Sequence, residues 1–337
     1  MFGIVDPQDV YHTVNANISL GEGELVGESQ SKQDKVWLWV VISAIALIII
    51  FGFIGNVMVI IAVKSTKKLQ TVSNYFIINL SISDLVFVTC VLPFNIYTFI
   101  TDGWYLEETL CKFIGFMGYT LTGTTIMTVV LIAYNRYKLV TDMMGYKRLY
   151  SKTNMAIMIT LSWTLPVVFL LPAITELWGK FGYVPMMVTC NLLLDHNSQK
   201  FKIFLLIVRA GIPCVLIVYF YIKIYLTTYN SSKRILANMR FLAPTDTNNL
   251  SREMHLTKMM VVIFLVFAIS YFPCTITGLI DWNHVMSKTF HMFCATTVYI
   301  GSALNPVLYG LLNQQFRNAY IKLMCRQRHP THTLIKQ

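Results

Sequence analysis

Residues 36–63 read VWLWVVISAIALIIIFGFIGNVMVIIAV, and this stretch contains no charged residue. A helix needs about 20 consecutive apolar residues to cross the hydrocarbon core of a bilayer. The stretch is therefore long and apolar enough to form a transmembrane helix, and it is the first indication of the class of protein to which the chain belongs.

Six further stretches of similar length follow, so the sequence predicts seven spans. Their expected bounds are Val36–Val63, Asn74–Ile100, Thr109–Leu139, Thr153–Thr175, Phe201–Thr227, His255–Ile280 and Val285–Leu311. Seven runs of bilayer length argue against buried core helices of a soluble protein, and the short alternating segments of a transmembrane barrel are absent. The 337 residues are 55% hydrophobic and 13% charged, against about 25% charged in an ordinary soluble domain. We expect an all-α membrane protein, a bundle of seven transmembrane helices.

Basic residues in the short loops indicate the orientation of the bundle. Lys and Arg cluster after the first, third, fifth and seventh spans, and this side should face the cytoplasm. The opposite loops and the N-terminal segment are acidic, so the N-terminus is expected outside. The chain then divides into an extracellular segment 1–35, a bundle 36–311 and a cytoplasmic tail 312–337. The net charge of +11 is a signal of topology and implies no nucleic-acid partner.

Of the seven cysteines, only Cys111 and Cys190 fall in predicted extracellular positions. That compartment is oxidising, so we expect a disulfide between them; the alternative is two free thiols. Cys325 follows the last span beside basic residues and is a candidate for palmitoylation, the alternative again being a free thiol. Asn17 begins a glycosylation sequon on the predicted outside.

Asp84 lies in the middle of the second span, where an ionisable group costs about 2.5–3.5 kcal/mol on insertion scales. Such groups face a bundle interior that supplies water, an ion or amide partners. One interpretation is a hydrated sodium site formed by Asp84, Asn56, Thr125, Ser302 and Asn305. The other is a structural carboxyl that is hydrogen-bonded to amides. The residues leave both interpretations open, and no other cofactor is expected.

Arg136 stands at the cytoplasmic end of the third span. A lone arginine at a helix end usually snorkels to the interface. Glu253, at the cytoplasmic foot of the sixth span, is a candidate partner that would tie the two helices together. Pro213, Pro273 and Pro306 each remove a helix hydrogen bond and can act as hinges. Three interrupted helices favour a bundle that switches between two states, although a transporter can share this feature.

Several short motifs occur in a fixed order along these spans. They are Gly55-Asn56-Val57, Leu80-Ser81-Ile82-Ser83-Asp84, Trp104 with Cys111, Asn135-Arg136-Tyr137, Trp163, Pro213 with Tyr221, Phe267 with Pro273, and Asn305-Pro306-Val307-Leu308-Tyr309 followed by Phe316. In this order, each on its proper span, they resemble the motifs of the rhodopsin-like, class A, G-protein-coupled receptors. The resemblance covers essentially the whole membrane region, and it implies a short amphipathic eighth helix on the cytoplasmic face.

Two further segments narrow the resemblance. Ser270-Tyr271-Phe272-Pro273 and residues 312–320 are similar to those of a small group within the family. That group holds the insect moody and trapped-in-endoderm receptors and a vertebrate receptor for medium-chain fatty acids. The melatonin receptors, which we place further away, share the Asn-Arg-Tyr motif.

The resemblance implies a receptor of the plasma membrane and not an enzyme. In this family a ligand binds between the outer halves of spans 3, 5, 6 and 7, and the inner end of span 6 moves outward. The C-terminal helix of a G-protein α subunit then enters the opened cleft, and arrestin is a further expected partner. The residues that correspond to the family's switches and coupling surface are Asn135, Arg136, Tyr137, Glu253, Tyr221, Ile126, Pro213, Phe267, Asn305, Pro306 and Tyr309.

Two positions depart from the family pattern. Asn135 replaces the acid that usually precedes the arginine, so Glu253 is expected to carry more of the restraint on Arg136, or basal activity is higher. Tyr271 replaces the usual tryptophan of the sixth span, where an aromatic side chain acts as a rotamer switch beneath the ligand.

The ligand is inferred from the same comparison. Gly118 stands where amine receptors carry an aspartate, which disfavours an amine, and Tyr299 stands at the position of the retinal lysine, which excludes a retinal Schiff base. Arg209 lies one turn before Pro213 with no acid near it in sequence, and predicts an anionic or carbonyl-bearing ligand. The alternative is an arginine that snorkels outward or stacks on an aromatic ring. The expected lining residues are Arg209, Gly118, Tyr119, Thr122, Tyr271, Cys274, His291 and Tyr299.

The alternative for His291 is a hydrated residue at the edge of a loop. The expected ligand is a small molecule, a lipid or a peptide. Two other classes of function are alternatives to a receptor. A secondary transporter should show internal repeats and discontinuous helices. A structural or adhesion protein should carry an extracellular module, and the 35 residues before the first span contain none.

Overall fold

The computed structural model describes residues 7–237, 244–281 and 285–327. Within these ranges, the side chains of residues 7–32, 34, 231–237, 244–258, 260, 326 and 327 lie outside the description. The elements are α1 (Pro7–Ser65), η1 (Lys67–Leu69), α2 (Val72–Cys90), α3 (Leu92–Thr101), α4 (Glu108–Thr141), α5 (Met143–Leu149), α6 (Lys152–Ile174), β1 (Phe181–Val184), β2 (Thr189–Leu192), α7 (His196–Leu205), η2 (Leu206–Gly211), α8 (Ile212–Ala237), α9 (Pro244–Ile280), α10 (Lys288–Leu312) and α11 (Gln314–Gln327).

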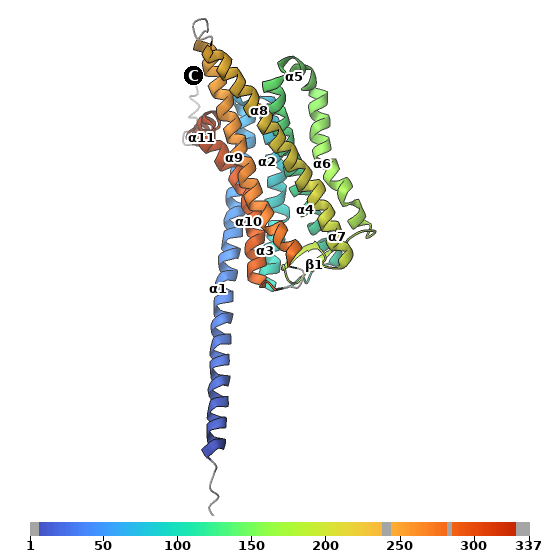
Figure 1. Ribbon diagram of the computed structural model, residues 1–337, viewed down its shortest axis with the longest axis vertical. Coiled ribbons are helices and arrows are strands. Elements are labelled where there is room, and N and C mark those ends of the chain that lie inside the picture. The colour runs from blue at the N-terminus through green and yellow to red at the C-terminus, as the bar shows by residue number, and fades with distance from the viewer. Residues whose placement is uncertain (1–6, 238–243, 282–284, 328–337) are drawn as a thin grey trace, which may run out of the picture.

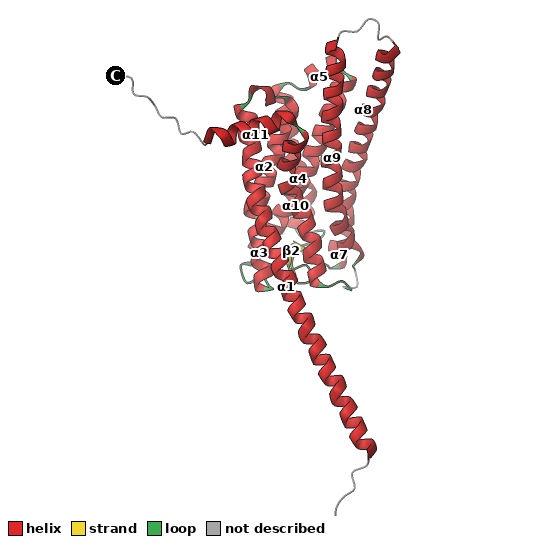
Figure 2. Cartoon of the chain, turned by 90° about the vertical axis from the view of Figure 1, so that its left-hand side faces the viewer, coloured by secondary structure: helices red, strands yellow, loops and turns green. Residues whose placement is uncertain are grey.

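The long helices pack side by side in a bundle (Figures 1 and 2), as the sequence predicts. Within the described ranges, six helical segments are long and apolar enough to cross a membrane. The seventh, α10, is more polar because it carries residues such as His291, Ser302 and Asn305. Helix α1 begins at Pro7, well before the predicted Val36, but its apolar part spans Lys35–Ser65. After α10, α11 lies across the end of the bundle (Figure 2) at the place of the predicted eighth helix.

Two of the spans are interrupted, which the apolar pattern does not reveal. The second span is divided into α2 and α3 beside Pro93, whose ring nitrogen cannot donate a helix hydrogen bond. The fifth span changes from α7 to the π-helix η2 and then to α8. Here the N–H of Ile212 donates to the carbonyl of Ile207, five residues earlier, just before Pro213. Single turns of π-helix are rare and are frequent at functional sites.

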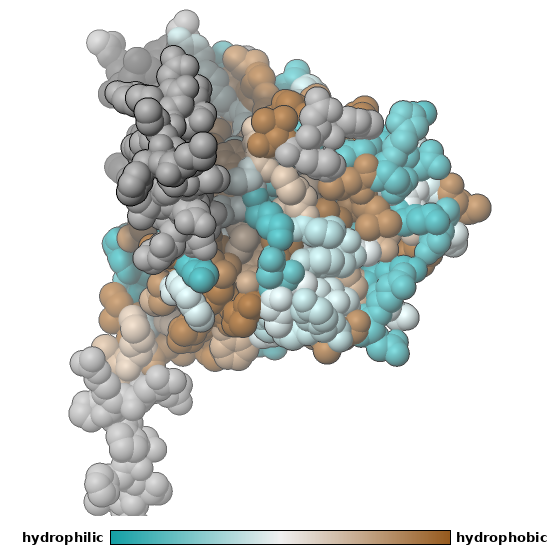
Figure 3. Space-filling model, turned by 90° about the horizontal axis from the view of Figure 1, so that it is seen from below, coloured by the Kyte–Doolittle hydropathy of each residue, from teal (hydrophilic) through white to brown (hydrophobic). Residues whose placement is uncertain are grey.

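The two ends of the bundle carry different elements. Helix α3, helix α7 and the hairpin of β1 and β2 lie at the end from which α1 projects, and α5 and α11 lie at the other (Figures 1 and 2). The first end is the predicted extracellular one. Figure 3 views the molecule from this end and shows hydrophilic residues mixed with hydrophobic ones. Ion pairs such as Lys112–Glu176 and Lys288–Asp102 connect its loops and helix ends.

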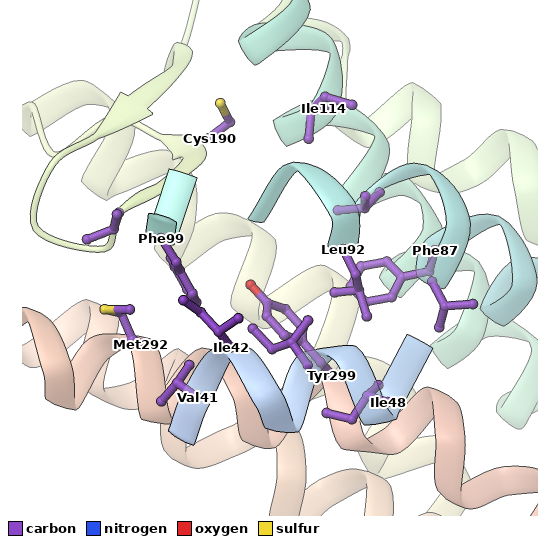
Figure 4. Close-up of a cluster of buried hydrophobic side chains, with 14 of the residues drawn as sticks. Val41, Ile42, Ile48, Phe87, Leu92, Phe99, Ile114, Cys190, Met292 and Tyr299 are labelled. Atoms are coloured by element: carbon purple, nitrogen blue, oxygen red, sulfur yellow. The ribbon is translucent and has the colours of Figure 1, made fainter. Parts of the chain in front are cut away.

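Apolar side chains fill the bundle in two large clusters. The outer cluster joins residues of α1, α2, α3, α4 and α10 and includes Ile42, Phe87, Leu92 and Tyr299 (Figure 4). The inner cluster lies nearer the cytoplasmic end and includes Phe76, Tyr309 and Phe316. The candidate site occupies the region beside the outer cluster.

Candidate functional site

A cavity of about 180 Å³ opens in the outer half of the bundle. All eight residues expected to bind a ligand line it. They are Gly118, Tyr119 and Thr122 on α4, Arg209 on η2, Tyr271 and Cys274 on α9, and His291 and Tyr299 on α10. Four segments that are far apart in sequence therefore meet at one place. That these residues bind a ligand stays a prediction.

The hairpin of β1 and β2 forms one wall of this cavity. Its strands pair antiparallel, with Tyr183 opposite Cys190. The predicted disulfide is present: Cys190 is bonded to Cys111 at the head of α4, with Cα atoms 5.3 Å apart. The bond holds β2 against the bundle, and Thr189, Cys190 and Asn191 of β2 line the cavity.

Side-chain hydrogen bonds add to this attachment. The Tyr119 hydroxyl donates to Asn191 Oδ1 at 2.7 Å. The Thr189 hydroxyl donates to Asn95 Oδ1 at 3.0 Å, and Asn95 Nδ2 donates to the Tyr299 hydroxyl at 2.9 Å. The hairpin is thus tied to α4, α3 and α10, and the wall it forms is rigidly placed.

Arg209 is the largest of the fully buried side chains among the described residues, with 2% exposure. This burial excludes the snorkelling alternative. Its guanidinium carbon lies 5.0 Å from the centre of the Tyr119 ring, so the aromatic contact given as the alternative to a ligand contact is present. Within the described part of the chain, Arg209 Nε has no hydrogen-bond partner. Nε lies on the side of Gly123, so the atoms that a ligand in the cavity would meet are the terminal nitrogens of the guanidinium.

Gly123 provides the space in which Arg209 lies. A Cβ atom at this position would be 2.8 Å from Pro166 Cβ and 3.3 Å from Arg209 Nε. Any larger residue would push against α6 on one side and the guanidinium on the other. The glycine is therefore part of the site although it does not face the cavity.

Lys202 also lines the cavity, and the sequence reasoning missed it. Its Nζ atom is buried and has no hydrogen-bond partner among the described residues. Lys202 stands seven residues before Arg209, a spacing that would return to the same face of a regular α-helix after two turns, although the π-helix between them shifts this phase. That spacing was the available signal. No acidic residue is found among the described residues that line this cavity.

His291 is 6% exposed and so is buried, unlike a hydrated residue at a loop edge. Its Nε2 lies 2.8 Å from Asp281 Oδ2 at the outer end of α9. Burial acts to raise the pKa of the Asp281 carboxyl, but hydrogen bonds from His291 and from the N–H groups of Val285 and Met286 outweigh it, so the pKa lies below its usual value. His291 is thus engaged with the loop at the rim of the cavity.

A smaller cavity of about 40 Å³ lies beneath the first and contains Asp84. Asn305 Nδ2 donates to Asp84 Oδ2 at 2.8 Å, and Ser302 also hydrogen-bonds this carboxyl. Thr125 lines the same cavity. Asn56 does not, since its Nδ2 donates to the backbone carbonyls of Gly52 and Ser302. Within the described residues, no group of three or more His, Cys, Asp or Glu could hold a metal ion.

Tyr271 separates the two cavities, because it lines both of them together with Thr122. Its ring stacks on that of Phe267, with centroids 5.4 Å apart. Phe267 lines only the lower cavity. The tyrosine that replaces the family's tryptophan is therefore in contact with both the outer site and the path toward the cytoplasm. Ile126 is buried in the next turns of α4, and Pro213 lies at the start of α8.

At the inner end, Asn135 hydrogen-bonds other elements. Its Oδ1 accepts from the Ser73 hydroxyl of α2, and its Nδ2 donates to the Tyr146 hydroxyl of α5 at 3.2 Å. Arg136 is buried beside it. The side chain of Glu253, its predicted partner, lies outside the described residues. The missing acid is thus replaced by an amide that joins three elements.

The aromatic residues of the inner end are also packed. The Tyr309 ring stacks on Phe316, with centroids 5.4 Å apart, and Tyr137 stacks on Phe220 at 5.3 Å. The Tyr221 hydroxyl is buried and has no hydrogen-bond partner among the described residues.

The remaining predicted residues are Pro306 inside α10, Cys325 on α11 and Asn17 near the N-terminus. Pro306 packs closely against Gly55, where a Cβ atom would be 2.8 Å from its ring. Cys325 is exposed on α11. The side chain of Asn17 lies outside the described residues.

Comparisons with known proteins agree with this arrangement. Residues 55–309 match the model of the 7 transmembrane receptor (rhodopsin family). The chain is 28% identical over 331 residues to the G-protein coupled receptor moody of Drosophila melanogaster, covering 81% of this chain and 49% of that protein. It is 30% identical over 302 residues to the melatonin receptor type 1B-B of Danio rerio, covering 84% and 82%.

Among solved structures, squid rhodopsin has the same fold, with a TM-score of 0.77, 24% identity and coverage of 87% of each chain. The predicted resemblance to the moody and melatonin receptors is confirmed. The chain spans about half the length of the moody receptors that it matches.

Proposed function

The chain belongs to the rhodopsin family of seven-transmembrane receptors, and on that premise we propose that it is a cell-surface receptor that binds an anionic ligand and activates a heterotrimeric G protein. The negative charge of the ligand is inferred from one observation. The guanidinium of Arg209 is buried and lines the cavity, and its Nε has no hydrogen-bond partner among the described residues. No bond is made or broken in this function.

The cost of a buried cation supports this proposal. Arginine stays protonated at any physiological pH, and a charge within a transmembrane segment is costly unless something compensates it. Tyr119 compensates one face of the guanidinium. A carboxylate or phosphate of the ligand would compensate the donor edge. The ammonium of Lys202 raises the positive charge of the same cavity.

The contacts below the cavity support a route for the signal. A ligand that displaces Tyr271 also disturbs its stacking on Phe267. Both residues are on α9, whose inner end moves outward in this family. Agonist binding then shifts an equilibrium between two states of the bundle. Arg136 would contact the C-terminal helix of the G-protein α subunit, with Tyr221 and Tyr309 turned toward it, and arrestin would bind the same open face.

Four accessory features belong to the proposal. A sodium ion beside Asp84 would favour the inactive state, since Asn305, Ser302 and Thr125 supply oxygen atoms around that cavity. Glu253 would restrain Arg136 from the sixth span. Cys325, exposed on α11, would carry a palmitoyl chain, and Asn17 a glycan.

The test is a G-protein activation assay in cells that express the full chain, screened with carboxylates, phosphates, neutral lipids, peptides and amines. Active compounds should be anions. Arg209→Ala should lower the potency of the best anion about thirtyfold or more, because truncating one side of a buried charge pair costs about 2–5 kcal/mol. Arg209→Lys should restore part of it.

The exposed Arg148 of α5 offers a matched control, and Arg148→Ala should respond like the wild type at equal surface level. Unchanged potency in Arg209→Ala, or activation by amines alone, would refute the anionic ligand. In the same assay, Glu253→Ala should raise signalling without agonist, and sodium should lower agonist potency in the wild type but not in Asp84→Asn.

A further inference from the structure

We propose that the cavity binds an elongated ligand with an acidic group at each end, one held by Lys202 and the other by Arg209. This inference rests on the proposed function, since it specifies the ligand of the same site.

The shape of the cavity follows from the helices that line it. Its lining extends along α4 from Ile114 to Thr122, along α9 from Tyr271 to Leu279, and from Lys202 on α7 to Arg209 on η2. Each stretch covers about two helical turns, which is a rise of about 10–12 Å. The cavity is therefore long in the direction of the bundle axis.

The two cations mark opposite ends of that length. Lys202 is on α7, the first helix after the hairpin, and belongs to the outer end. There Met187 of the hairpin approaches α9, with its Cε 3.3 Å from the place of a Cβ at Gly278. Arg209 lies about 10 Å deeper along the helix axis and contacts the Tyr119 ring. Thr122 and Tyr271, which also line the smaller cavity below, mark this deep end.

Neither cation is neutralised by the described protein. Lys202 Nζ and Arg209 Nε are both buried without a hydrogen-bond partner among the described residues. The nearest acidic influence on Lys202 is Asp195 at the start of α7, and these two side chains do not form an ion pair. A ligand with one acidic group would satisfy one cation and leave the other uncompensated.

The lining of the cavity is more apolar than polar, and its apolar residues include Phe87, Ile114, Met187, Leu205, Leu206 and Leu279. Among its polar residues, Asn95, Thr189 and Asn191 are hydrogen-bonded to one another or to Tyr119 and Tyr299. An unbranched hydrocarbon spacer fits such a wall because its burial needs no hydrogen bonds. The ligand class is thus a dianion whose acidic groups are joined by an apolar spacer.

The experiment uses the purified full chain in lipid nanodiscs and two series of probes. One series is unbranched α,ω-dicarboxylates of increasing chain length, and the other is monocarboxylates with the same numbers of carbons. Binding is measured by calorimetry. In the wild type, the best dicarboxylate should bind about thirtyfold or more tightly than its matched monocarboxylate, with an optimum at one chain length.

Lys202→Gln should abolish that advantage and leave the affinity for the monocarboxylate almost unchanged. Lys202→Arg, which keeps the charge, should retain most of the advantage and shows that the site still folds. Lys200, exposed two residues earlier on the same helix, is the matched control, and Lys200→Gln should behave like the wild type.

Three results would overturn the inference. If the two series bound equally at every chain length, the protein would be a receptor for monoanions. The proposed function would then stand, but the contact between Lys202 and a second acidic group would not. An advantage that persists in Lys202→Gln would show that another group holds the second carboxylate. If neither series bound, the inference of a ligand with two acidic groups would be wrong, and so would the proposal that the receptor binds a carboxylate.

Discussion

In the inner half of the bundle, buried amides hydrogen-bond to other helices, whereas in the outer half Lys202 Nζ and Arg209 Nε are buried with no hydrogen-bond partner among the described residues. Asn79 of α2 is the clearest inner case: its Nδ2 donates to Thr128 and Ser162, and its Oδ1 accepts from Trp163 Nε1 at 2.8 Å. Lys202 and Arg209 are the outer case. A buried polar group whose hydrogen bonds are satisfied stabilises one arrangement of the helices. A buried polar group without a hydrogen-bond partner is unfavourable, and a ligand that supplies the partner removes that cost.

This contrast predicts opposite responses to mutation. Removing a polar group from the inner half should weaken the fold, because its partners lose their hydrogen bonds. Removing a cation from the outer half should weaken ligand binding and spare or strengthen the fold.

The largest expected effect comes from the disulfide that holds the hairpin over the outer site. Cys190→Ser opens a link between residues 79 positions apart, and for a loop of this length the cost is about 4 kcal/mol. Surface level and anion binding should both fall, and Cys111→Ser with Cys190→Ser should be no worse than either change alone. Flow cytometry and binding assays measure the two quantities.

Cys90 is free and exposed, so Cys90→Ser is the control and should match the wild type. Normal binding in Cys190→Ser would show that the hydrogen bonds of Asn95 and Asn191 hold the hairpin without the disulfide.

The second effect tests the inner half. Asn79→Ala leaves the Trp163 indole N–H without its acceptor, whereas Thr128 and Ser162 keep bonds to their own backbone carbonyls. One buried donor left unpaired costs about 1–3 kcal/mol. The free energy of unfolding of the purified protein, obtained from thermal melts, should fall by that amount. Ligand affinity at a temperature where the variant is folded should stay within twofold. A large loss of affinity with unchanged stability would break the contrast.

The third effect tests the outer half by the same measurement. Arg209→Met replaces a buried charge by an apolar side chain of similar length, and such replacements are often neutral or stabilising by about 1–4 kcal/mol. The ligand-free protein should therefore melt at the same or a higher temperature. Arg148→Met, at an exposed position of α5, should change little. A marked drop in stability would mean that stacking on Tyr119 makes Arg209 a structural residue.

The smallest effect concerns Asp142, which caps α5 at the cytoplasmic end. A hydrogen bond from Gly145 N and the nearby Lys138 lower the pKa of this carboxyl. Its contribution to stability is present above the ordinary pKa of aspartate and is lost as the pH falls through the lowered value. The protection factor of the Gly145 amide, which is its exchange rate relative to the intrinsic rate at the same pH, should thus stay constant from neutral pH to about pH 4. Below that it should fall toward the protection factor of Asp142→Ala, and a fall already near pH 6 would contradict this.

Much of the fold could be predicted from the sequence because a bilayer imposes a length and an apolar composition on each span. The same reasoning could not find the division at Pro93 or the π-helix at Leu206–Gly211. Those features depend on which backbone hydrogen bonds are satisfied and not on hydropathy. The hairpin and α5 are short, so they carry no periodic signal.

The candidate site was predicted in part. Arg209 stood out because a charge within an apolar run is rare, and Tyr119 and Tyr299 followed from the family's pocket positions. Lys202 was missed because it lies at the edge of its span, where lysines are common and usually reach water. Gly123 was missed because its role is to leave space for Arg209, which only the packing of α4 against α6 reveals.

The π-helix in the fifth span affects how the ligand specificity of such a receptor can change in evolution. A turn with bonds to the fifth residue holds one residue more than an α-helical turn would. If a deletion removed that residue, the turn would close to ordinary α geometry, and the helix before and after it would keep its phase because the bulge had absorbed the extra residue. Lys202, before the bulge, would keep its face, whereas the side chains within the bulge, Arg209 among them, would shift around the axis by up to one residue, about 100°. The gain or loss of a single codon in this turn would therefore change which side chain faces the deep end of the cavity without any change to the other helices.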